Sequence, residues 1–219
     1  MNQRALIFVN GELPNLDAAR SLIGDDDFVI AADGGTRHAL ALGLVPSVVI
    51  GDLDSVSPAN LRTLEAQGAE IRQFPEDKDE TDLELALLYA GEHSFDRILL
   101  IGALGGRLDQ MLGNLSLLSD PAWNAIDVRI DDGVQQAFFA REQAQIHGRV
   151  GEIVSLIPWH GDVTITNTEG LRWPLHNETL FAHQTRGISN EMTAENARVE
   201  IDDGVLLIIH TRESASHQV

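Results

Sequence analysis

The sequence predicts an α/β protein of two domains, a parallel-sheet domain over residues 1–130 and an antiparallel β domain over residues 131–219. In the first part, continuous apolar runs alternate with segments of helical periodicity, which indicates a parallel sheet covered by helices on both faces. In the second part the apolar runs are short and recur every ~8–12 residues between Gly, Pro, Asn or Asp, which favours an antiparallel sandwich or a partial barrel.

Strands of the first domain are expected at its apolar runs, which are Arg4–Val9, Phe28–Ala32, Val48–Ile50, Glu70–Phe74 and Arg97–Ile101. Helices are expected between or after them, over residues 16–23 and 36–42, from residue 58, and over residues 81–92 and 109–118. Ser57 and Pro58 favour a helix start, because serine caps free backbone N–H groups and proline suits the first helical position. Thr81 and Glu84 have the spacing of a capping box, which predicts another helix start.

Strands of the second domain follow one another with no convincing helical period between them. They are expected at Gln135–Phe139, Gln143–His147, Ile153–Ile157, Val163–Thr166, Leu171–Trp173, Gly187–Met192, Ala197–Ile201 and Val205–His210.

The composition excludes several classes of function. The 219 residues include 34 acidic and 15 basic side chains, a net charge of −19, which argues against binding to nucleic acid or to an anionic membrane surface. The chain has no cysteine, which excludes disulfides, thiolate nucleophiles and cysteine-based metal sites. No apolar run approaches the ~18 residues that span a bilayer, and the first run is too short for a signal peptide, so we expect a cytoplasmic protein.

Acidic residues gather after the predicted strands: Asp33 after the second, Asp52 and Asp54 after the third, and Asp77, Asp79 and Asp82 after the fourth. Loops after parallel strands share one sheet edge, so up to six carboxylates meet there, and Mg²⁺ or Ca²⁺ would relieve their repulsion. Mg²⁺ commonly joins one or two carboxylates to substrate phosphates, which favours a nucleotide enzyme. Aspartate is also common in turns and first turns of helices, so a purely structural role stays open for Asp33 and Asp82.

Residues 102–107 form a glycine-rich loop after the fifth strand. Its backbone N–H groups can cradle phosphate, although the spacing matches neither the dinucleotide fingerprint nor the Walker loop. Arg107, Asp109 and Gln110 add polar side chains at the same edge. Lys78 is the only lysine and is either a charge for phosphate or a solvent-exposed loop residue.

Trp173, Ser189 and Asn190 are the notable residues of the second domain. Trp173 precedes Pro174, so its strand is expected to end there. The residues alone leave two interpretations open, because Trp173 suits a core and Ser189 with Asn190 suits a simple bulge or turn.

Ordered motifs along nearly the whole chain resemble the thiamine pyrophosphokinase family. The most specific pair is Gly51-Asp52-Leu53-Asp54-Ser55 with Asp77-Lys78-Asp79-Glu80-Thr81-Asp82. The other matches are Asp33-Gly34-Gly35, Gly105-Gly106-Arg107-Leu108-Asp109-Gln110 and Ile188-Ser189-Asn190, and the segment 167–173 is similar to the family's second domain.

The resemblance implies a Rossmann-like nucleotide domain followed by a β-sandwich, in a homodimer with thiamine bound between subunits. It implies transfer of the pyrophosphoryl group of ATP to the hydroxyl of thiamine, releasing AMP. Asp52, Asp54 and Asp82 would be catalytic and hold Mg²⁺. ATP would be positioned by Asp33, Gly34, Gly35, Lys78, Gly105, Gly106, Arg107, Asp109 and Gln110. Trp173 would stack on thiamine, with Ser189 and Asn190 hydrogen-bonded to its pyrimidine.

Two alternatives stay open beside this hypothesis. One is a pyrophosphokinase for another alcohol, such as a hydroxymethylpterin. The other is a non-catalytic nucleotide- or Ca²⁺-binding module whose β domain binds a partner. Release of AMP from ATP separates the enzyme from the module.

Overall fold

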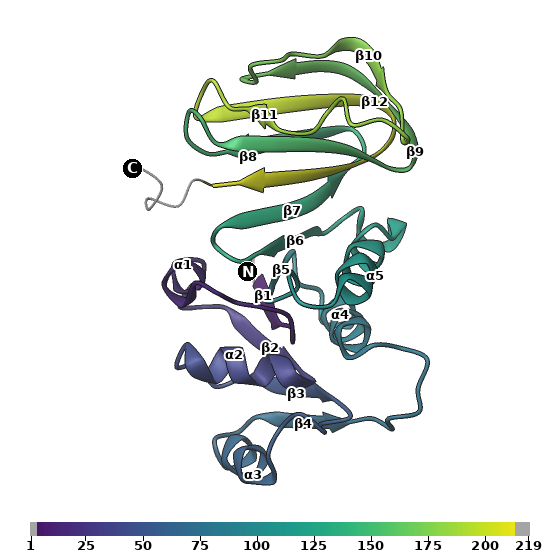
Figure 1. The fold of residues 1–219 in the computed structure, drawn as a ribbon. Helices are drawn as coiled ribbons and strands as arrows, with labels where there is room; N and C mark the ends of the chain where they lie inside the picture. The colour runs from purple at the N-terminus through teal and green to yellow at the C-terminus, as the bar shows by residue number, and fades with distance from the viewer. Residues whose placement is uncertain (1–3, 213–219) are drawn as a thin grey trace. The chain divides into compact units, whose positions relative to one another are not determined.

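The computed structural model describes residues 4–212, and the chain divides into two compact units, Met1–Gly133 and Val134–Val219 (Figure 1). The mixed α/β class predicted from the sequence is confirmed. Each unit has its own hydrophobic core, so each can position its functional side chains independently.

The first unit contains a parallel sheet with the order β6-β5-β1-β2-β3-β4. Its strands are β1 Arg4–Phe8, β2 Phe28–Ala32, β3 Val48–Gly51, β4 Glu70–Gln73, β5 Arg97–Ile101 and β6 Asp127–Asp131. The five predicted strands are confirmed to within one residue at each end. The sequence did not indicate β6, because charged residues interrupt its apolar run.

Helices and short 3₁₀ turns connect these strands. They are α1 Leu16–Arg20, η1 Asp33–Gly35, α2 Thr36–Ala41, α3 Pro58–Ala66, α4 Asp82–Glu92, α5 Leu108–Leu118 and η2 Pro121–Trp123. Both predicted caps are confirmed, since Ser57 Oγ accepts from the backbone N–H of Asn60 at 3.2 Å and Thr81 Oγ1 accepts from that of Glu84 at 3.2 Å.

The helices cover both faces of the parallel sheet, as the continuous apolar strands predicted (Figure 1). On one face, Ala19 of α1 and Ala39 of α2 pack against Leu6 and Phe8 of β1. On the other face, α4 lies against β2 and β3 and buries its apolar side. The loops after the strands are therefore left free to build a site at the carboxyl edge.

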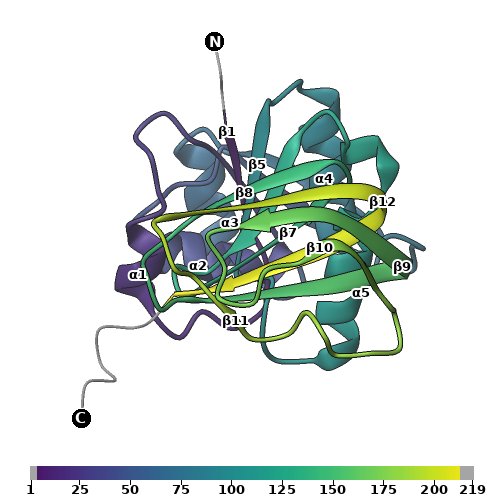
Figure 2. The same cartoon turned by 90° about the horizontal axis from the view of Figure 1, so that it is seen from above.

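The second unit is antiparallel, with the strand order β10-β9-β12-β7, β8 paired to β12 and β11 paired to β9. Its strands are β7 Gln135–Ala140, β8 Gln143–His147, β9 Ile153–Glu169, β10 His176–Leu180, β11 Asn190–Glu191 and β12 Asn196–Thr211. Figure 2 shows the two long strands, β9 and β12, which are paired along most of their length.

Several predicted strand limits of the second unit are wrong. β9 joins the segments predicted at 153–157 and 163–166, and β12 joins those at 197–201 and 205–210. The polar residues between them resemble turns, but the ladder continues through register shifts between Glu200 and Val205. Residues 171–173 do not form a strand; Leu171 makes an isolated bridge with Met192, and the strand follows at 176–180.

No helix within residues 4–212 is long and apolar enough to cross a membrane.

Candidate active site

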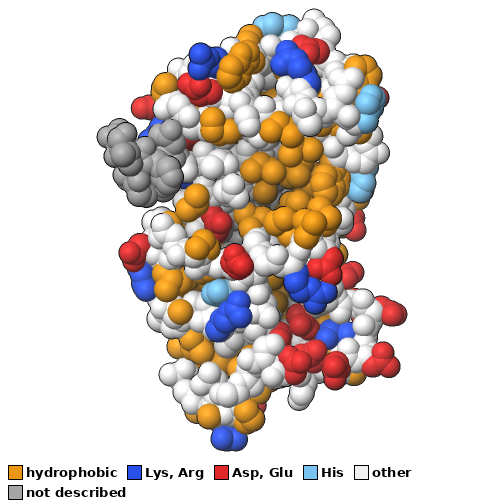
Figure 3. All heavy atoms as spheres, in the orientation of Figure 1, with side chains coloured by type: hydrophobic (Ala, Val, Ile, Leu, Met, Phe, Trp, Pro, Cys, Tyr) orange, Lys and Arg blue, Asp and Glu red, His pale blue; other side chains and the backbone are white. Residues whose placement is uncertain are grey.

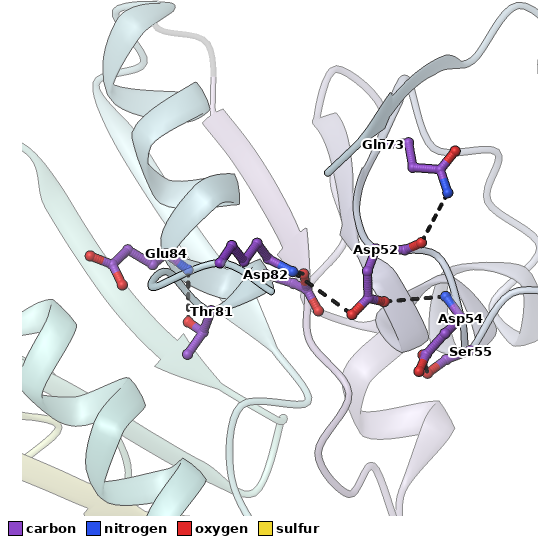
Figure 4. A network of polar contacts seen from close by, with 8 residues as sticks. Asp52, Asp54, Ser55, Gln73, Thr81, Asp82 and Glu84 are labelled. Carbon is purple, nitrogen blue, oxygen red and sulfur yellow. Dashed lines mark hydrogen bonds and ion pairs between the residues drawn. The ribbon is translucent and has the colours of Figure 1, made fainter. Parts of the chain in front are cut away.

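Three of the six predicted carboxylates meet at the carboxyl edge of the parallel sheet. Figure 4 shows two of them, Asp52 and Asp82. Asp33 follows β2, Asp52 follows β3, and Asp82 is the first residue of α4. One carboxylate oxygen of each lies within 4.8 Å of the others. The cluster therefore forms because two strand ends and one helix start share the same edge.

The backbone at Gly51 and Asp33 makes this approach possible. Gly51 has φ +149°, and a Cβ atom there would lie 2.8 Å from Asp33 Cβ and 2.9 Å from Asp82 Oδ1. Asp33 itself is 5% exposed and takes φ +37°, a conformation that non-glycine residues seldom adopt. A side chain at position 51 would push the carboxylates apart.

Lys78 lies beside the cluster and not in open solvent. Its Nζ is 3.0 Å from Asp82 Oδ1 and 3.8 Å from Asp52 Oδ2, and its side chain is 11% exposed. Burial lowers the pKa of Lys78, but the neighbouring Asp82, Asp52 and Asp33 outweigh burial and raise that pKa above its ordinary value. The ammonium therefore stays charged, and the exposed-loop interpretation is wrong.

One ammonium does not satisfy three carboxylates. Asp33 Oδ1 and Asp82 Oδ1 are both buried and have no hydrogen-bond partner within residues 4–212; Lys78 meets the latter as an ion pair outside hydrogen-bond geometry. Burial raises the pKa of Asp82, and the negative charges of Asp52 and Asp33 raise it further. Lys78 lowers this pKa, but by less than the other effects together. Three negative charges and one positive charge leave −2, and a cluster of carboxylate oxygens with this residual charge suits a divalent cation.

Asp54 lies outside this cluster. Leu53 takes φ +67° and buries its side chain in the core, which breaks the extended geometry that would direct residues 52 and 54 to the same side. The Asp54 carboxylate instead accepts a hydrogen bond from Ser55 Oγ at 2.9 Å, and its backbone N–H donates to Asp52 Oδ1 at 3.2 Å (Figure 4). Asp77 and Asp79 are exposed and also lie outside it.

A cavity of about 350 Å³ lies between the loops after β1 and β5. Gly105 and Gly106 line it with φ +74° and +71°, and Gly105 is close enough to Glu12 that a Cβ atom would lie 2.9 Å from Glu12 Cβ. Arg107 and Gln110 also line it. The full lining is Val9, Asn10, Gly11, Glu12, Arg37, Ala103, Gly105, Gly106, Arg107, Gln110, Met111 and Asn114.

Asn10, Glu12 and Arg37 are cavity residues that the sequence reasoning missed. Arg37 donates from Nη2 to the carbonyl of Gly11 at 2.9 Å, which ties α2 to the first loop. Only their place in the sequence could have indicated them. The polar pair Asn10-Gly11 follows the first strand, and its loop therefore lies at the same sheet edge as the acidic motifs.

Gly34 and Gly35 do not line the described cavity. Both are buried in the 3₁₀ turn after β2, packed against Asn10 and Phe8, so their small size serves close packing.

Arg107 and Asp109 form a two-point ion pair at the start of α5, with Nε–Oδ1 and Nη2–Oδ2 distances of 3.1 and 2.6 Å. The hydrogen bond to Asp109 raises the pKa of Arg107, and the same bond lowers that of Asp109. Asp109 lines a second cavity, of about 340 Å³, which shares Gln110 and Asn114 with the first and reaches Thr81 beside Asp82.

In the second unit, Trp173 is 49% exposed, so the interpretation as a core tryptophan is wrong. Ser189 is exposed at φ +59°, and its N–H donates to Ser155 Oγ at 3.1 Å. Asn190 is 5% exposed and bonds to the backbone of Trp173. The structure thus brings Asn190 to the backbone of Trp173, while Ser189, its chain neighbour, bonds to Ser155.

Two family models match the chain. "Thiamin pyrophosphokinase, catalytic domain" covers residues 19–151, and "Thiamin pyrophosphokinase, vitamin B1 binding domain" covers residues 141–206. The chain belongs to the thiamine pyrophosphokinase family. The catalytic-domain match contains the carboxylate cluster and Lys78, and the second match contains Trp173, Ser189 and Asn190.

Known members of the thiamine pyrophosphokinase family agree over most of the chain. A thiamine pyrophosphokinase of Bacillus subtilis is 31% identical over 186 residues, 84% of this chain and 87% of its own length. A solved structure from Bacillus subtilis superposes with a TM-score of 0.85 at 27% identity, covering 97% of this chain and all of that one. The structure of the Candida albicans enzyme, at 17% identity and a TM-score of 0.77 over 96% of this chain and 89% of its own, shares the fold.

Proposed function

We propose that the chain is an ATP-dependent diphosphotransferase that moves the pyrophosphoryl group of ATP to the hydroxyl of thiamine, giving thiamine diphosphate and AMP. The observation that carries this is the cluster of Asp33, Asp52 and Asp82, with two buried oxygens that have no hydrogen-bond partner within residues 4–212, in the unit that also holds a cavity lined by glycine and arginine. Family membership favours thiamine over a pterin alcohol, and a catalytic domain over a binding module.

Mg²⁺ is the cation that we propose for the cluster. The donor set consists of carboxylate oxygens, which suit hard cations, and the residual charge of the cluster matches a divalent ion. When bound, the ion supplies neutralisation of phosphate charge. Asp33, Asp52 and Asp82 would hold it, and the Asp54 assigned by the family motif would have to turn away from Ser55 to join them.

ATP would occupy the first, Rossmann-like unit, with its phosphates at the carboxyl edge. Gly105, Gly106, Arg37 and Arg107 line the cavity, and backbone N–H groups and guanidinium groups suit anionic phosphate. Lys78 remains protonated beside Asp82 and can hold a phosphate oxygen through Nζ. Because transfer to a neutral hydroxyl mainly needs alignment and charge neutralisation, these groups supply what the chain itself contributes.

Thiamine would bind to the second, β-sandwich unit through Trp173. An indole face suits both the flat aminopyrimidine and the positively charged thiazolium. The net charge of −19 attracts this cation, and Figure 3 shows acidic side chains gathered around the loop between β4 and α4.

A homodimer would complete the thiamine site. Leu108 and Leu112, one turn apart on α5, are 64% and 47% exposed. Apolar side chains on one helix stripe favour burial against a second copy. We place the enzyme in the cytoplasm, where its proposed substrate ATP is available.

The test is incubation of the protein with ATP, Mg²⁺ and thiamine, followed by mass spectrometry of the products. AMP and thiamine diphosphate are expected in equal amounts, and EDTA should abolish both. ADP with thiamine monophosphate would mean that the γ-phosphate is attacked and would overturn the proposal. Turnover of a hydroxymethylpterin with none of thiamine would overturn the substrate.

A further inference from the structure

Asn190 directs its side chain at the backbone of Trp173. Its Oδ1 accepts from the N–H of Trp173 at 3.1 Å and from that of Glu191 at 2.9 Å, and its Nδ2 donates to the carbonyl of Trp173 at 2.8 Å. The side chain is buried, so these bonds are shielded from water. An amide held in this way is part of the frame around the indole and is poorly placed to bind a ligand directly.

Glu191 holds the neighbouring residue, Arg172. The N–H of Arg172 donates to the Glu191 carbonyl at 2.9 Å, and Arg172 Nη1 donates to Glu191 Oε2 at 2.8 Å. The Arg172 guanidinium carbon lies 5.1 Å from the centroid of the Trp173 ring, within cation–π distance. One face of the indole is therefore covered by a side chain that β11 fixes.

Trp173 needs such support because the sheet does not provide it. It lies in a bend between the Leu171–Met192 bridge and β10, and the following Pro174 has no N–H to donate. Its ring is half-exposed, so core packing does not fix the side chain. The Asn190 amide and the Arg172–Glu191 pair replace the missing strand bonds.

We propose that Asn190 and the Arg172–Glu191 pair are positioning residues that hold the Trp173 indole as a preordered platform for the flat rings of the substrate. The family resemblance implied that Asn190 hydrogen-bonds to thiamine. In this proposal Asn190 instead acts through Trp173. The inference rests on the proposed function, since it takes thiamine as the molecule that stacks on Trp173. Preorder matters because a platform that is already fixed loses less conformational freedom when the substrate binds.

The experiment uses the full chain in a Trp123→Phe, Trp159→Phe background, so that Trp173 is the only fluorophore of its kind. We compare three variants, Asn190→Ala, Glu191→Ala and Glu191→Gln, with the control Glu178→Gln. Glu178 forms an exposed ion pair with Arg186 in the same unit. Time-resolved fluorescence anisotropy reports indole motion without substrate, and steady-state kinetics report KM for thiamine and for ATP.

We expect Asn190→Ala and Glu191→Ala to increase indole motion and to raise the thiamine KM on the order of tenfold, the scale of one lost hydrogen bond, with the ATP KM unchanged. Glu191→Gln keeps an acceptor for Arg172 and should recover most of the loss, and Glu178→Gln should match the parent. Should Asn190→Ala fail to fold, the two Glu191 variants decide the question.

Unchanged indole motion in both alanine variants would overturn the inference, whatever the kinetics. Greater motion with an unchanged thiamine KM would also overturn it, because the frame would then not serve binding. Trp173→Ala separates this from a failure of the proposed function: if it too leaves the thiamine KM unchanged, Trp173 is not the thiamine platform. Products other than thiamine diphosphate and AMP from the parent protein would overturn the function itself.

Discussion

Asp82→Asn should stabilise the metal-free protein while destroying its activity. Asp82 lies within 4.8 Å of two other carboxylates and 3.0 Å from Lys78 Nζ. With an effective dielectric constant of about 20, each carboxylate pair costs at least ~3.5 kcal/mol and the lysine pair returns ~5.5 kcal/mol. The two repulsions, about 7 kcal/mol together, exceed the attraction, so the neutral amide should gain about 1–2 kcal/mol.

The gain should depend on pH. The pKa of Asp82 in the folded protein is raised, chiefly by burial, so the stability linked to this group is present below the unfolded pKa of about 4 and is lost as pH rises through the folded pKa. Asp82→Asn and the parent should therefore be equally stable in acid, and the variant should lead at pH 8. Urea unfolding in EDTA across this range measures the difference.

Magnesium should reverse the order of stability. The ion binds the folded cluster, and a hundredfold excess over Kd would add about 2.7 kcal/mol to the parent. Asp82→Asn should gain little, and its kcat should fall by at least ~10²-fold. Asp26→Asn, at an exposed loop position, is the control and should change neither quantity. A variant less stable than the parent in EDTA at pH 8, or one stabilised equally by Mg²⁺, would refute the reasoning.

Three further predictions concern Gly51, the Asp52 and Asp54 carboxylates, and His38. Gly51→Ala should lower kcat at least ~10-fold, because a Cβ atom there displaces Asp33 and Asp82. Gly43→Ala is the control: Gly43 also has positive φ, but no atom lies within 4 Å of a new Cβ. This variant should lose stability and keep its kcat. Asp52→Asn should lower kcat by ~10²-fold or more and Asp54→Asn by less, because Asp54 lies outside the cluster; equal losses would place both on the cation. His38 Nε2 lies 2.9 Å from the carbonyl oxygen of Gly11, and burial lowers the pKa of His38. The stability linked to this group should therefore be present above pH ~6.5 and be lost as pH falls. His38→Gln should flatten this part of the dependence of the unfolding free energy on pH.

The meeting of Asp33, Asp52 and Asp82 could be predicted because it follows from topology alone. Parallel strands joined by helices place their following loops at one edge, and the apolar runs were strong enough to locate the ends of β2 and β3. The helix starts at Ser57 and Thr81 were equally predictable, because capping is a local interaction of three or four residues.

Side-chain direction within the cluster could not be predicted, because it depends on single backbone angles. The left-handed turn at Leu53 is invisible in an Asp-Leu-Asp pattern, and it decides that Asp54 turns toward Ser55. The contacts of Asn190 with Trp173 could not be predicted for a different reason. Asn190 and Trp173 are 17 residues apart and meet only because β11 pairs with β9 and Met192 with Leu171.

The net charge of the chain has opposite effects on the two proposed substrates. A protein of net charge −19 attracts cationic thiamine and repels the ATP triphosphate, so the nucleotide needs local positive charge at the sheet edge. Arg37 and Arg107 line the cavity that the nucleotide would occupy, but Arg107 is paired with Asp109, and Lys78 is paired with Asp82 and Asp52. Binding of a divalent cation to those carboxylates would weaken their hold on Lys78 and release its ammonium toward phosphate. ATP affinity should therefore rise with the cation by more than the ion's own charge explains, and Lys78→Met should remove that excess.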